Sequence, residues 1–252
     1  MRERSTRHHV DYTHRHSPPQ LLISVTDAEE ARSALQGGAD IIDVKNPAEG
    51  ALGAAAVTAL RDVCTLLPPE CPSSAALGES TPAPGVLALA AYGAAALGVS
   101  YVKVGLRTAS ADDAVTLLRV VQQGAHAANP ACVVVAVGYA DADRIGALPW
   151  SLLPEIALTA RVGGCMIDTA LKDGHTLFDY CDELALGRWL DMCRRSGLLC
   201  ALAGSLGPDH LPILRRLCPD VVGFRGAACR GHRARGRVDA ALVAALRAGL
   251  HG

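Results

Sequence analysis

The chain has 252 residues, half of them hydrophobic, and a formal net charge of -1 at neutral pH. Such a balanced charge gives no support for nucleic-acid binding, which usually leaves a basic patch on a protein. No apolar run reaches the roughly 18 residues that a membrane span needs. We therefore expect one large globular core, with no nucleic acid and no membrane among its partners.

Residues 1–20 differ in character from the rest of the chain. They are basic, polar and rich in histidine, and they lack the apolar core of a signal peptide. Histidine is a common metal ligand, but no periodic apolar face accompanies these residues. We expect a flexible N-terminal extension over residues 1–20, followed by a single domain over residues 21–252.

The nine cysteines are scattered along the chain, and no two of them form a CxxC pair. Several lie in apolar segments, where a free thiol behaves as a small hydrophobic side chain. The pattern favours reduced, buried thiols, and hence a cytoplasmic protein.

From residue 21 onward, short apolar runs alternate with helical stretches. The Val, Ile and Leu content of the runs suits parallel strands that helices cover. The run at 74–79 is weak, and its spacing from the others is part of the reason for predicting it. The predicted strands are residues 21–25, 40–45, 74–79, 101–106, 132–139, 164–169, 199–204 and 221–226.

The helical stretches between these runs have recognisable ends. Asp27 with Glu30, and Ser110 with Asp113, have the spacing of a capping box. A Gly-Gly pair at 37–38 is a stop signal for the first helix.

Alternating strands and helices predict a parallel sheet with crossover helices. Eight such units in about 230 residues favour a closed (β/α)8 barrel, the TIM-barrel fold, built as one domain. An open doubly wound sheet usually has a Gly-rich dinucleotide loop after its first strand. The sequence at that position, SVTDAEEA, contains no such loop.

In a TIM barrel the active site lies at the C-terminal ends of the strands, so polar residues there are candidates for function. The second predicted strand ends in Asp43 and Lys45, which are two residues apart and so share a face. Their apolar neighbours should face the helices, and the charged pair should face the barrel interior. Lys103 in the fourth strand follows by the same argument. Asp168 ends the sixth strand, and Lys172 lies on the same side if a helical turn follows.

These charged side chains have two interpretations. They could be ion pairs without chemistry, because lysine is almost never fully buried unless it is paired. A buried pair is weak evidence for stability, however, and stability alone does not explain three strands that converge on lysine and aspartate.

Lysines at such a position favour carbonyl chemistry. A crowded or desolvated ammonium has a lowered pKa, and a neutral lysine can attack a carbonyl to form a Schiff base. A second lysine can then move protons, and an aspartate can orient or stabilise the iminium. We expect an aldol reaction, an isomerisation or an elimination.

The ends of the last two strands suggest a second feature of the substrate. Gly204 and Ser205 follow the seventh strand, and Arg225 and Gly226 end the eighth. Barrels often bind phosphate with these loops, through backbone N–H groups that glycine leaves accessible. Arg225 would add a fork of donors. Ordinary turn glycines are the alternative. A phosphorylated small carbonyl compound fits both halves of the site.

Several motifs together resemble one known family. The segments GGADIIDVKNPAEGALGA, YVKVGL, AVGYADADR, IDTALKDG and LAGSL are similar to those of the (5-formylfuran-3-yl)methyl phosphate synthases, also called 4-(hydroxymethyl)-2-furancarboxaldehyde phosphate synthases. The resemblance runs from about residue 21 to residue 230, and its DVKNP and DTALKDG motifs are long and specific. Residues 1–20 have no counterpart in it.

The resemblance implies a (β/α)8-barrel lyase that condenses two molecules of glyceraldehyde 3-phosphate into a phosphorylated furan aldehyde, with loss of phosphate and water. The furan is a precursor of methanofuran, a one-carbon carrier. The resemblance further implies that Lys45 forms the Schiff base, that Lys103 accepts a proton, and that Asp43, Asp168 and Lys172 belong to the same site. We expect no metal and no cofactor, since enamine chemistry replaces a Lewis acid.

Two other interpretations stay open on the sequence alone. Another phosphate-binding barrel, such as a Schiff-base aldolase or a lyase similar to orotidine-phosphate decarboxylase, fits the same strand ends. A non-catalytic barrel that binds a phosphorylated metabolite and reports on it to a protein partner also fits. In either case we expect a phosphorylated small molecule as ligand and, since barrels of this size often associate, a homo-oligomer.

Overall fold

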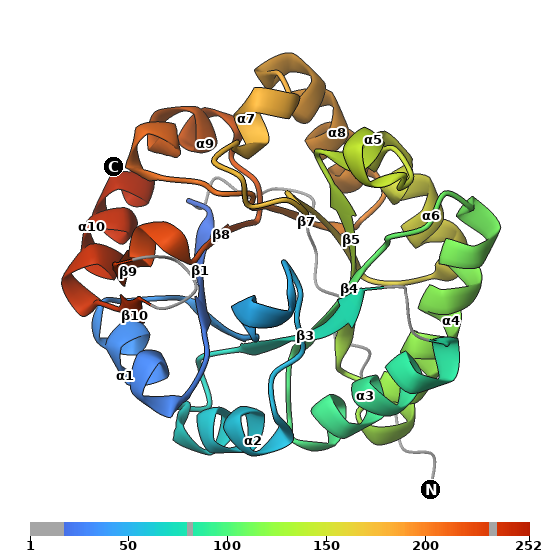
Figure 1. The fold of residues 1–252 in the computed structure, drawn as a ribbon, viewed down its shortest axis with the longest axis horizontal. Coiled ribbons are helices and arrows are strands. Elements are labelled where there is room, and N and C mark those ends of the chain that lie inside the picture. Colours follow the sequence, from blue (N-terminus) through green and yellow to red (C-terminus); the bar gives the residue numbers. More distant parts are fainter. Residues whose placement is uncertain (1–17, 80–82, 232–235) are drawn as a thin grey trace, which may run out of the picture.

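Eight parallel strands close into a barrel in the computed structural model, which describes residues 18–79, 83–231 and 236–252. Each strand pairs with the next one along the chain, and β8 pairs with β1 (Figure 1). The fold class predicted from the sequence, a (β/α)8 barrel, is confirmed. The barrel strands are β1 (Gln20–Val25), β2 (Ile41–Val44), β3 (Ser73–Glu79), β4 (Tyr101–Gly105), β5 (Val133–Tyr139), β6 (Gly164–Asp168), β7 (Leu199–Leu202) and β8 (Val221–Phe224).

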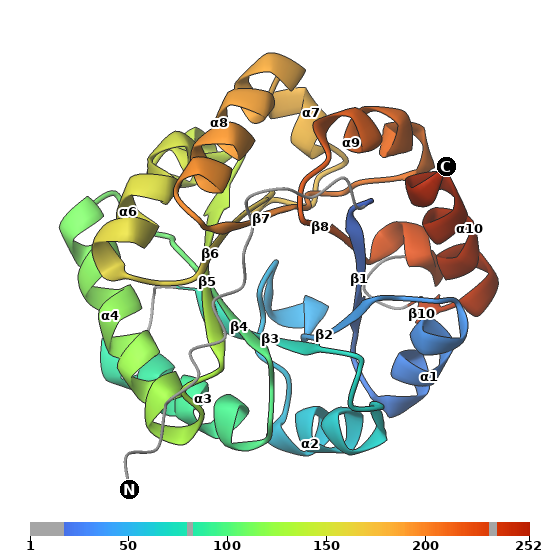
Figure 2. The ribbon, with the colours of Figure 1, turned by 180° about the vertical axis from the view of Figure 1, so that it is seen from behind.

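The helices form a ring around the outside of the strands, which is visible from both ends of the barrel (Figures 1 and 2). Within the described ranges, no helix is both long enough and apolar enough to cross a membrane. The α-helices are α1 (Ala28–Gln36), α2 (Val57–Leu66), α3 (Pro84–Ala96), α4 (Ala111–Ala128), α5 (Ala142–Ile145), α6 (Leu153–Ala160), α7 (Leu177–Tyr180), α8 (Glu183–Arg195), α9 (Leu211–Leu217) and α10 (Ala240–His251). The 3-10 turns are η1 (Pro47–Glu49), η2 (Trp150–Leu152), η3 (Pro208–His210) and η4 (Gly226–Ala228), and a short hairpin pairs β9 (Cys229–Arg230) with β10 (Arg237–Val238).

The predicted strand at 74–79, the weakest of the eight, is present as β3. Gln20 is the first residue of β1 and not part of an extension. Residues 1–17 of the predicted N-terminal extension lie outside the described residues.

The capping signal predicted for the first helix is confirmed. The Asp27 carboxylate accepts the N–H groups of Glu29 and Glu30, both at 3.0 Å. The Glu30 carboxylate accepts the N–H of Thr26 at 2.8 Å. In a standard capping box it would accept the N–H of the N-cap residue itself, which here is Asp27. After the helix, Gly38 has a φ of 87°, a conformation that glycine adopts without steric cost.

Side chains alternate along the strands between two apolar cores. In β2, Ile42 and Val44 belong to the outer core between strands and helices, whereas Ile41 belongs to the inner core with Met166. Asp43 therefore points into the barrel, as the sequence predicted.

A β-bulge changes this alternation in β3. Ala76 lies opposite Lys103 and Glu79 lies opposite Gly105, so three steps along β3 match two steps along β4. A bulge of this kind re-aims the side chain that follows it. Here it turns Glu79 toward the barrel mouth instead of the helices.

The segment after β2 folds back into the barrel mouth. In Figure 1 the turn η1 lies inside the ring of strands. Ala51 and Leu52 pack with the inner core, and the Gly53 carbonyl accepts the N–H of Asn46 at 2.8 Å. A Cβ at position 53 would lie only 2.2 Å from the Asn46 carbonyl oxygen, so the closure requires glycine. Segment 46–53 thus covers one side of the mouth.

All nine cysteines are free thiols, and most of them are buried, as the sequence suggested. Burial raises the pKa of Cys132 to about 11 and that of Cys181 to about 12. Thiols of this kind stay neutral and unreactive near neutral pH.

Candidate active site

Asp43 and Lys103 form a buried ion pair between β2 and β4. Lys103 Nζ lies 2.8 Å from Asp43 Oδ2. Ser24 of β1 donates its hydroxyl to the same oxygen at 2.9 Å. Burial opposes ionisation of Asp43, but the charges of Lys103 and Lys45 outweigh it and lower the pKa of the carboxyl. The hydrogen-bond partner of Asp43 is therefore Lys103, whereas Lys45 acts on Asp43 through its charge.

Lys45 lies just beyond β2 and is only 6% exposed. Its Nζ donates to the Ala51 carbonyl at 3.2 Å, so its hydrogen-bond acceptor is neutral. Loss of hydration is the main cause that lowers the Lys45 pKa to about 7. The charges of Asp168 and Asp43 raise this pKa, and the charges of the other two lysines lower it further. A pKa of about 7 leaves a substantial share of the Lys45 side chains as neutral amines at neutral pH, against roughly one in a few thousand for an unperturbed lysine.

Asp168 ends β6 and holds Lys172. Lys172 Nζ lies 2.8 Å from Asp168 Oδ1 and 3.0 Å from the Thr169 hydroxyl. The Thr169 N–H also donates to Asp168 Oδ1, at 2.7 Å. Burial opposes ionisation of Asp168, but Lys172 and Lys45 outweigh it and lower the pKa to about 2. Asp168 is therefore a carboxylate throughout the physiological pH range.

The loop after β6 brings Lys172 back to Asp168 without the helical turn that the spacing suggested. Residues 169–173 are not helical. Instead, the buried Asp141 accepts the N–H groups of Ala170 and Leu171 at 2.7 and 2.8 Å. Because Asp141 follows β5, these bonds connect the loops of two neighbouring strands and fix the direction in which Lys172 leaves the barrel.

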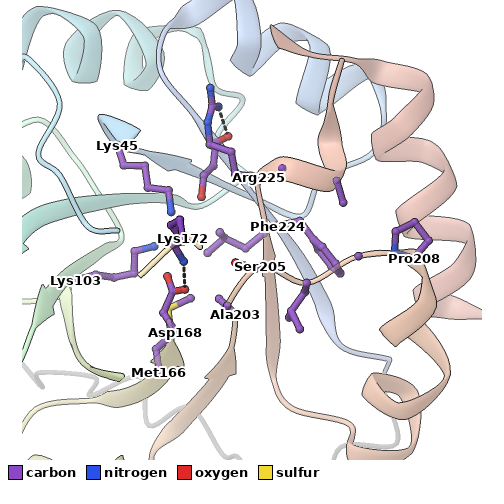
Figure 3. A pocket seen from close by; sticks show the side chains of 18 of the residues that line it. Lys45, Lys103, Met166, Asp168, Lys172, Ala203, Ser205, Pro208, Phe224 and Arg225 are labelled. Carbon is purple, nitrogen blue, oxygen red and sulfur yellow. Dashed lines mark hydrogen bonds and ion pairs between the residues drawn. The ribbon is translucent and has the colours of Figure 1, made fainter. Parts of the chain in front are cut away.

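A cavity of about 480 Å³ opens beside these groups at the C-terminal ends of the strands. Lys45, Lys103, Asp168 and Lys172 line one end of it. Figure 3 shows the amino groups of the three lysines turned toward one another and toward Asp168. The structure thus brings together four of the predicted site residues around one cavity, with Asp43 directly behind Lys103.

These three lysines are the only lysines in the chain, and every other side chain of permanent positive charge is an arginine. An arginine guanidinium stays protonated in proteins, so it cannot replace a lysine whose free amine is needed. Lysine usage is a signal that could have singled out the site from composition alone, and the sequence analysis did not use it.

The loops after β7 and β8 form the opposite end of the cavity and contain all four residues predicted to bind phosphate. Gly204 has a φ of 115° and Ser205 a φ of 51°, and non-glycine residues rarely adopt the latter conformation. Within the described residues, the N–H groups of Gly204, Ser205 and Gly226 have no hydrogen-bond acceptor. Backbone donors of this kind are suited to an anion.

Arg225 lines the cavity, but its guanidinium is turned away from the lysines (Figure 3). It forms a buried ion pair with Glu30 of α1, with Nη1 2.8 Å from Oε2, and it donates to the Ser24 carbonyl at 2.8 Å. This differs from the expectation that the guanidinium offers a fork of donors to phosphate, because that fork already faces Glu30. Arg225 instead connects β8 to β1 and α1.

A polar cluster that the sequence analysis did not predict lies at the ends of β3, β4 and β5. The Tyr139 hydroxyl donates to Glu79 Oε1 at 3.1 Å, and Arg107 donates to Glu79 Oε2 at 2.8 Å. Tyr139 is fully buried and lies opposite Asp168 in the sheet register. Burial and the nearby Glu79 raise the pKa of Tyr139, so its hydroxyl remains a donor. This cluster bounds the active site on the side away from the cavity.

Comparison with known proteins assigns the chain to a family. Residues 21–247 match the family model described as 4-HFC-P synthase. The chain belongs to the 4-HFC-P synthase family. Relatives named (5-formylfuran-3-yl)methyl phosphate synthase include the protein of Methanocaldococcus jannaschii, which is 44% identical over 90% of this chain and 97% of the relative. The protein of Methanothermobacter thermautotrophicus is 45% identical over the same shares. The chain is therefore an enzyme of the 4-HFC-P synthase family.

Solved structures of low sequence identity share the barrel. Phosphoribosyl anthranilate isomerase from Thermus thermophilus superimposes with a TM-score of 0.62 at 15% identity, over 92% of this chain and 98% of that one. KGPDC from Streptococcus mutans gives a TM-score of 0.62 at 13% identity, over 93% of this chain and 98% of that one. At these identities the likeness establishes the fold alone.

Replacement of Lys45 by methionine should stabilise this 4-HFC-P synthase family member while abolishing its activity. The folded-state pKa of Lys45, about 7, lies below the ordinary value of 10.5. Folding is therefore penalised at every pH at which Lys45 is protonated in the unfolded chain, that is, below about 10.5. Lys45→Met removes that penalty and should raise the free energy of unfolding at pH 7 by roughly 1–4 kcal/mol. Urea unfolding should show a difference that is largest at pH 7 and below and shrinks toward pH 10.

Lys45→Arg is the matched control, because arginine cannot release its proton in this environment. It should be less stable than the wild-type enzyme. A Lys45→Met variant that is no more stable than wild type at pH 7 would show that Lys45 is adequately solvated or paired.

We predict that position 105 must be glycine to leave room for the Tyr139 hydroxyl. A Cβ at this position would lie 2.1 Å from the Tyr139 hydroxyl, so Gly105→Ala should displace that hydroxyl from Glu79. We expect a loss of about 1–3 kcal/mol of stability, the usual cost of overpacking, together with reduced turnover. Gly187→Ala in α8, whose new Cβ would meet only Leu217 at 3.9 Å, is the control and should unfold at the same urea concentration as wild type or a higher one. Equal midpoints for Gly105→Ala and wild type would contradict the prediction.

Proposed function

We propose that this enzyme condenses two molecules of glyceraldehyde 3-phosphate into (5-formylfuran-3-yl)methyl phosphate, with Lys45 as the Schiff-base residue. The observation that carries the proposal is a buried lysine with a pKa of about 7 at one end of a cavity whose other end offers free backbone N–H groups. The relatives named for this product support the choice of substrate. Two triose phosphates equal one furan phosphate, one inorganic phosphate and two waters, so no oxidant or reductant is needed.

The first step is formation of the imine. The neutral Lys45 amine attacks the aldehyde carbon of one triose, and the carbonyl oxygen takes up protons and leaves as water. Lys172, held 2.8 Å from Asp168, is placed to supply a proton to that oxygen. The iminium that results carries a positive charge where Lys45 was neutral, and the ionised Asp43 and Asp168 stabilise it.

Proton transfer at carbon follows. Lys172 is left neutral by the first step and takes up the proton of Lys103, which then acts as the base: its free amine removes the proton from the carbon next to the iminium, and the C–H electrons move to form an enamine. The enamine electrons then expel phosphate from the third carbon and regenerate the iminium. The ion pair with Asp43 fixes the position of Lys103 Nζ for this transfer. Addition of the second triose, ring closure and loss of water complete the furan, and hydrolysis of the imine releases it.

The phosphate group is expected to bind at the ends of β7 and β8. The N–H groups of Gly204, Ser205 and Gly226 are available there, and a cavity of about 480 Å³ lies within the usual range for small-molecule sites. Arg225 supports this loop through Glu30 rather than by direct contact with the anion.

Borohydride trapping tests the Schiff base. Reduction in the presence of glyceraldehyde 3-phosphate should attach one triose-derived group to Lys45, located by peptide mass mapping. Because the chain has only three lysines, every candidate amine side chain can be followed in one digest. An adduct on Lys103 or Lys172 with none on Lys45 would refute the assignment.

Lys103→Met separates imine formation from the later steps. This variant should still be trapped at Lys45, whereas the rise in furan absorbance should slow by about 10²- to 10⁴-fold, the usual contribution of a general base. If Lys103→Met loses both trapping and turnover, Lys103 is needed for imine formation itself. Tight triose-phosphate binding by the wild-type chain without any furan product would contradict the proposed reaction.

The pH dependence of trapping follows from the Lys45 pKa. Below pH 7 the ammonium form predominates and cannot attack, so the initial trapping rate should fall as pH decreases through about 7 and level off above it. The measurement is the rate of adduct formation by mass spectrometry across this range. A midpoint near the ordinary lysine value of 10.5 would contradict the role given to desolvation.

A further inference from the structure

The base of the active-site cavity is apolar. Four neighbouring strands contribute to it: Leu22 lies in β1, Met166 in β6, Ala203 directly after β7, and Gly223 in β8. A Cβ at Gly223 would lie 3.3 Å from Met166 Cε, 3.4 Å from Ala203 Cβ and 3.5 Å from Leu22 Cδ2. The three side chains therefore meet around Gly223 and form one continuous surface, the apolar floor (Leu22, Met166, Ala203 and Gly223).

The apolar floor lies one layer beneath the polar groups of the site. Side chains two residues apart on a strand share a face, so Met166 lies under Asp168 and Leu22 lies under Ser24. Figure 3 shows Met166 and Ala203 below the amino groups of the lysines. Ala203 is followed at once by the loop whose N–H groups face the cavity. A ligand that reaches from the lysines to the loops after β7 and β8 therefore passes over the apolar floor.

Two of the four floor positions have much less side chain than a barrel interior usually has. Bulky branched residues dominate the interior layers of TIM barrels. Ala203 and Gly223 instead leave space above them, and this space belongs to the cavity of about 480 Å³. In the other half of the barrel mouth, Leu52 and Tyr139 fill the corresponding space. The cavity thus combines polar ends with an apolar base.

The substrate of the proposed reaction does not account for an apolar base. Every carbon atom of a triose phosphate carries an oxygen, and polar groups that lose water without a new hydrogen-bond partner are destabilised. The furan of the product is different, because it is a planar aromatic ring with apolar faces. Its formyl group and its phosphomethyl group extend from different ring carbons. When the formyl carbon is at Lys45 and the phosphate is at the loops after β7 and β8, the ring between them lies over the apolar floor.

We propose that the apolar floor binds one face of the furan ring and makes the site selective for the ring-closed, dehydrated species over the triose phosphates, an inference that rests on the proposed function. The Met166 thioether suits this contact, because sulfur packs favourably against aromatic rings. As water and phosphate leave, the intermediate loses polar groups and its contact with the apolar floor improves. Interactions that strengthen along the reaction accelerate the steps that form the ring.

A binding comparison without chemistry tests the proposal. Furan-3-ylmethyl phosphate has the ring and the phosphomethyl group but no aldehyde, so it cannot form an imine. Glycerol 3-phosphate has the same phosphomethyl end and a polar carbon chain. One ring face offers on the order of 60 Å² of apolar area, so the furan compound should bind to the wild-type enzyme about tenfold more tightly in calorimetry.

Three variants assign this preference to the apolar floor. Met166→Gln keeps the length of the side chain but makes it polar, and Ala203→Ser adds a single hydroxyl. Each should reduce the preference for the furan compound to about threefold or less, while binding of glycerol 3-phosphate stays close to that of wild type. Ala201→Ser is the matched control. It places the same hydroxyl one layer deeper on the same face of β7, outside the residues that line the cavity, and should keep the tenfold preference.

Turnover gives an independent readout. Met166→Gln should form the borohydride-trapped adduct on Lys45 at close to the wild-type rate, whereas furan absorbance should rise about tenfold more slowly, in proportion to the lost preference. Circular dichroism establishes that each variant is folded, and Ala203→Ser, the smaller change, decides the test if Met166→Gln does not fold.

Equal affinities of the wild-type enzyme for the two probes would overturn the proposal. So would a tenfold preference that persists in folded Ala203→Ser, or one that Ala201→Ser removes to the same extent. The binding comparison needs neither an imine nor turnover. Failure of the Schiff-base assignment, seen as an absent Lys45 adduct, is therefore recognised separately from failure of the floor assignment, seen as equal binding.

Discussion

Three lysines and two carboxylates meet inside an apolar barrel, and two ion pairs, Asp43 with Lys103 and Asp168 with Lys172, allow charge to remain there. Each carboxylate has one lysine within hydrogen-bond distance, since Asp43 holds Lys103 and Asp168 holds Lys172. The third lysine, Lys45, has only the Ala51 carbonyl. With the carboxylates already engaged, the excess positive charge is most easily relieved by release of a proton from Lys45. Burial is the main cause of the lowered pKa of Lys45, and the charges of Lys103 and Lys172 add to it, whereas Asp168 and Asp43 act in the opposite direction.

The two halves of the barrel mouth are filled differently. Over β2 to β5 the space is occupied by Leu52, by the Tyr139 ring and by Glu79, which the bulge in β3 turns inward. Over β6 to β8 small residues such as Ala203 and Gly223 leave the cavity open. The lysines lie where the filled half meets the open half, so the protein surrounds their stems while their amino groups face the space that a substrate enters. Such support on one side is what holds a reactive group in place.

Local patterns in the sequence predicted those features of the site that a single strand determines, namely which side chains point into the barrel. Alternation along β2 is enough to place Asp43 inside, and the ends of β4 and β6 follow from the same period of two. Pairings between distant strands could not be predicted. The contact of Asp43 with Lys103 depends on register, and Arg225 was expected at a phosphate because nothing marks Glu30, 195 positions away, as its partner. The inward turn of Glu79 was missed because the bulge shifts the alternation by one residue, a feature that the weak β3 pattern does not signal.

The restriction of lysine to positions 45, 103 and 172 has a consequence for the rest of the molecule. Aldehydes condense readily with primary amines and scarcely with protonated guanidinium groups. The proposed substrate and product are both aldehydes, and the cationic side chains outside the barrel mouth are arginines, so the chain exposes almost no amine that these aldehydes could modify. Apart from the chain terminus, the proposed substrate and product meet an amine only in the barrel mouth. Under the proposed reaction, the use of arginine elsewhere protects the protein, because covalent capture of an aldehyde is confined to the barrel mouth, where it leads to turnover.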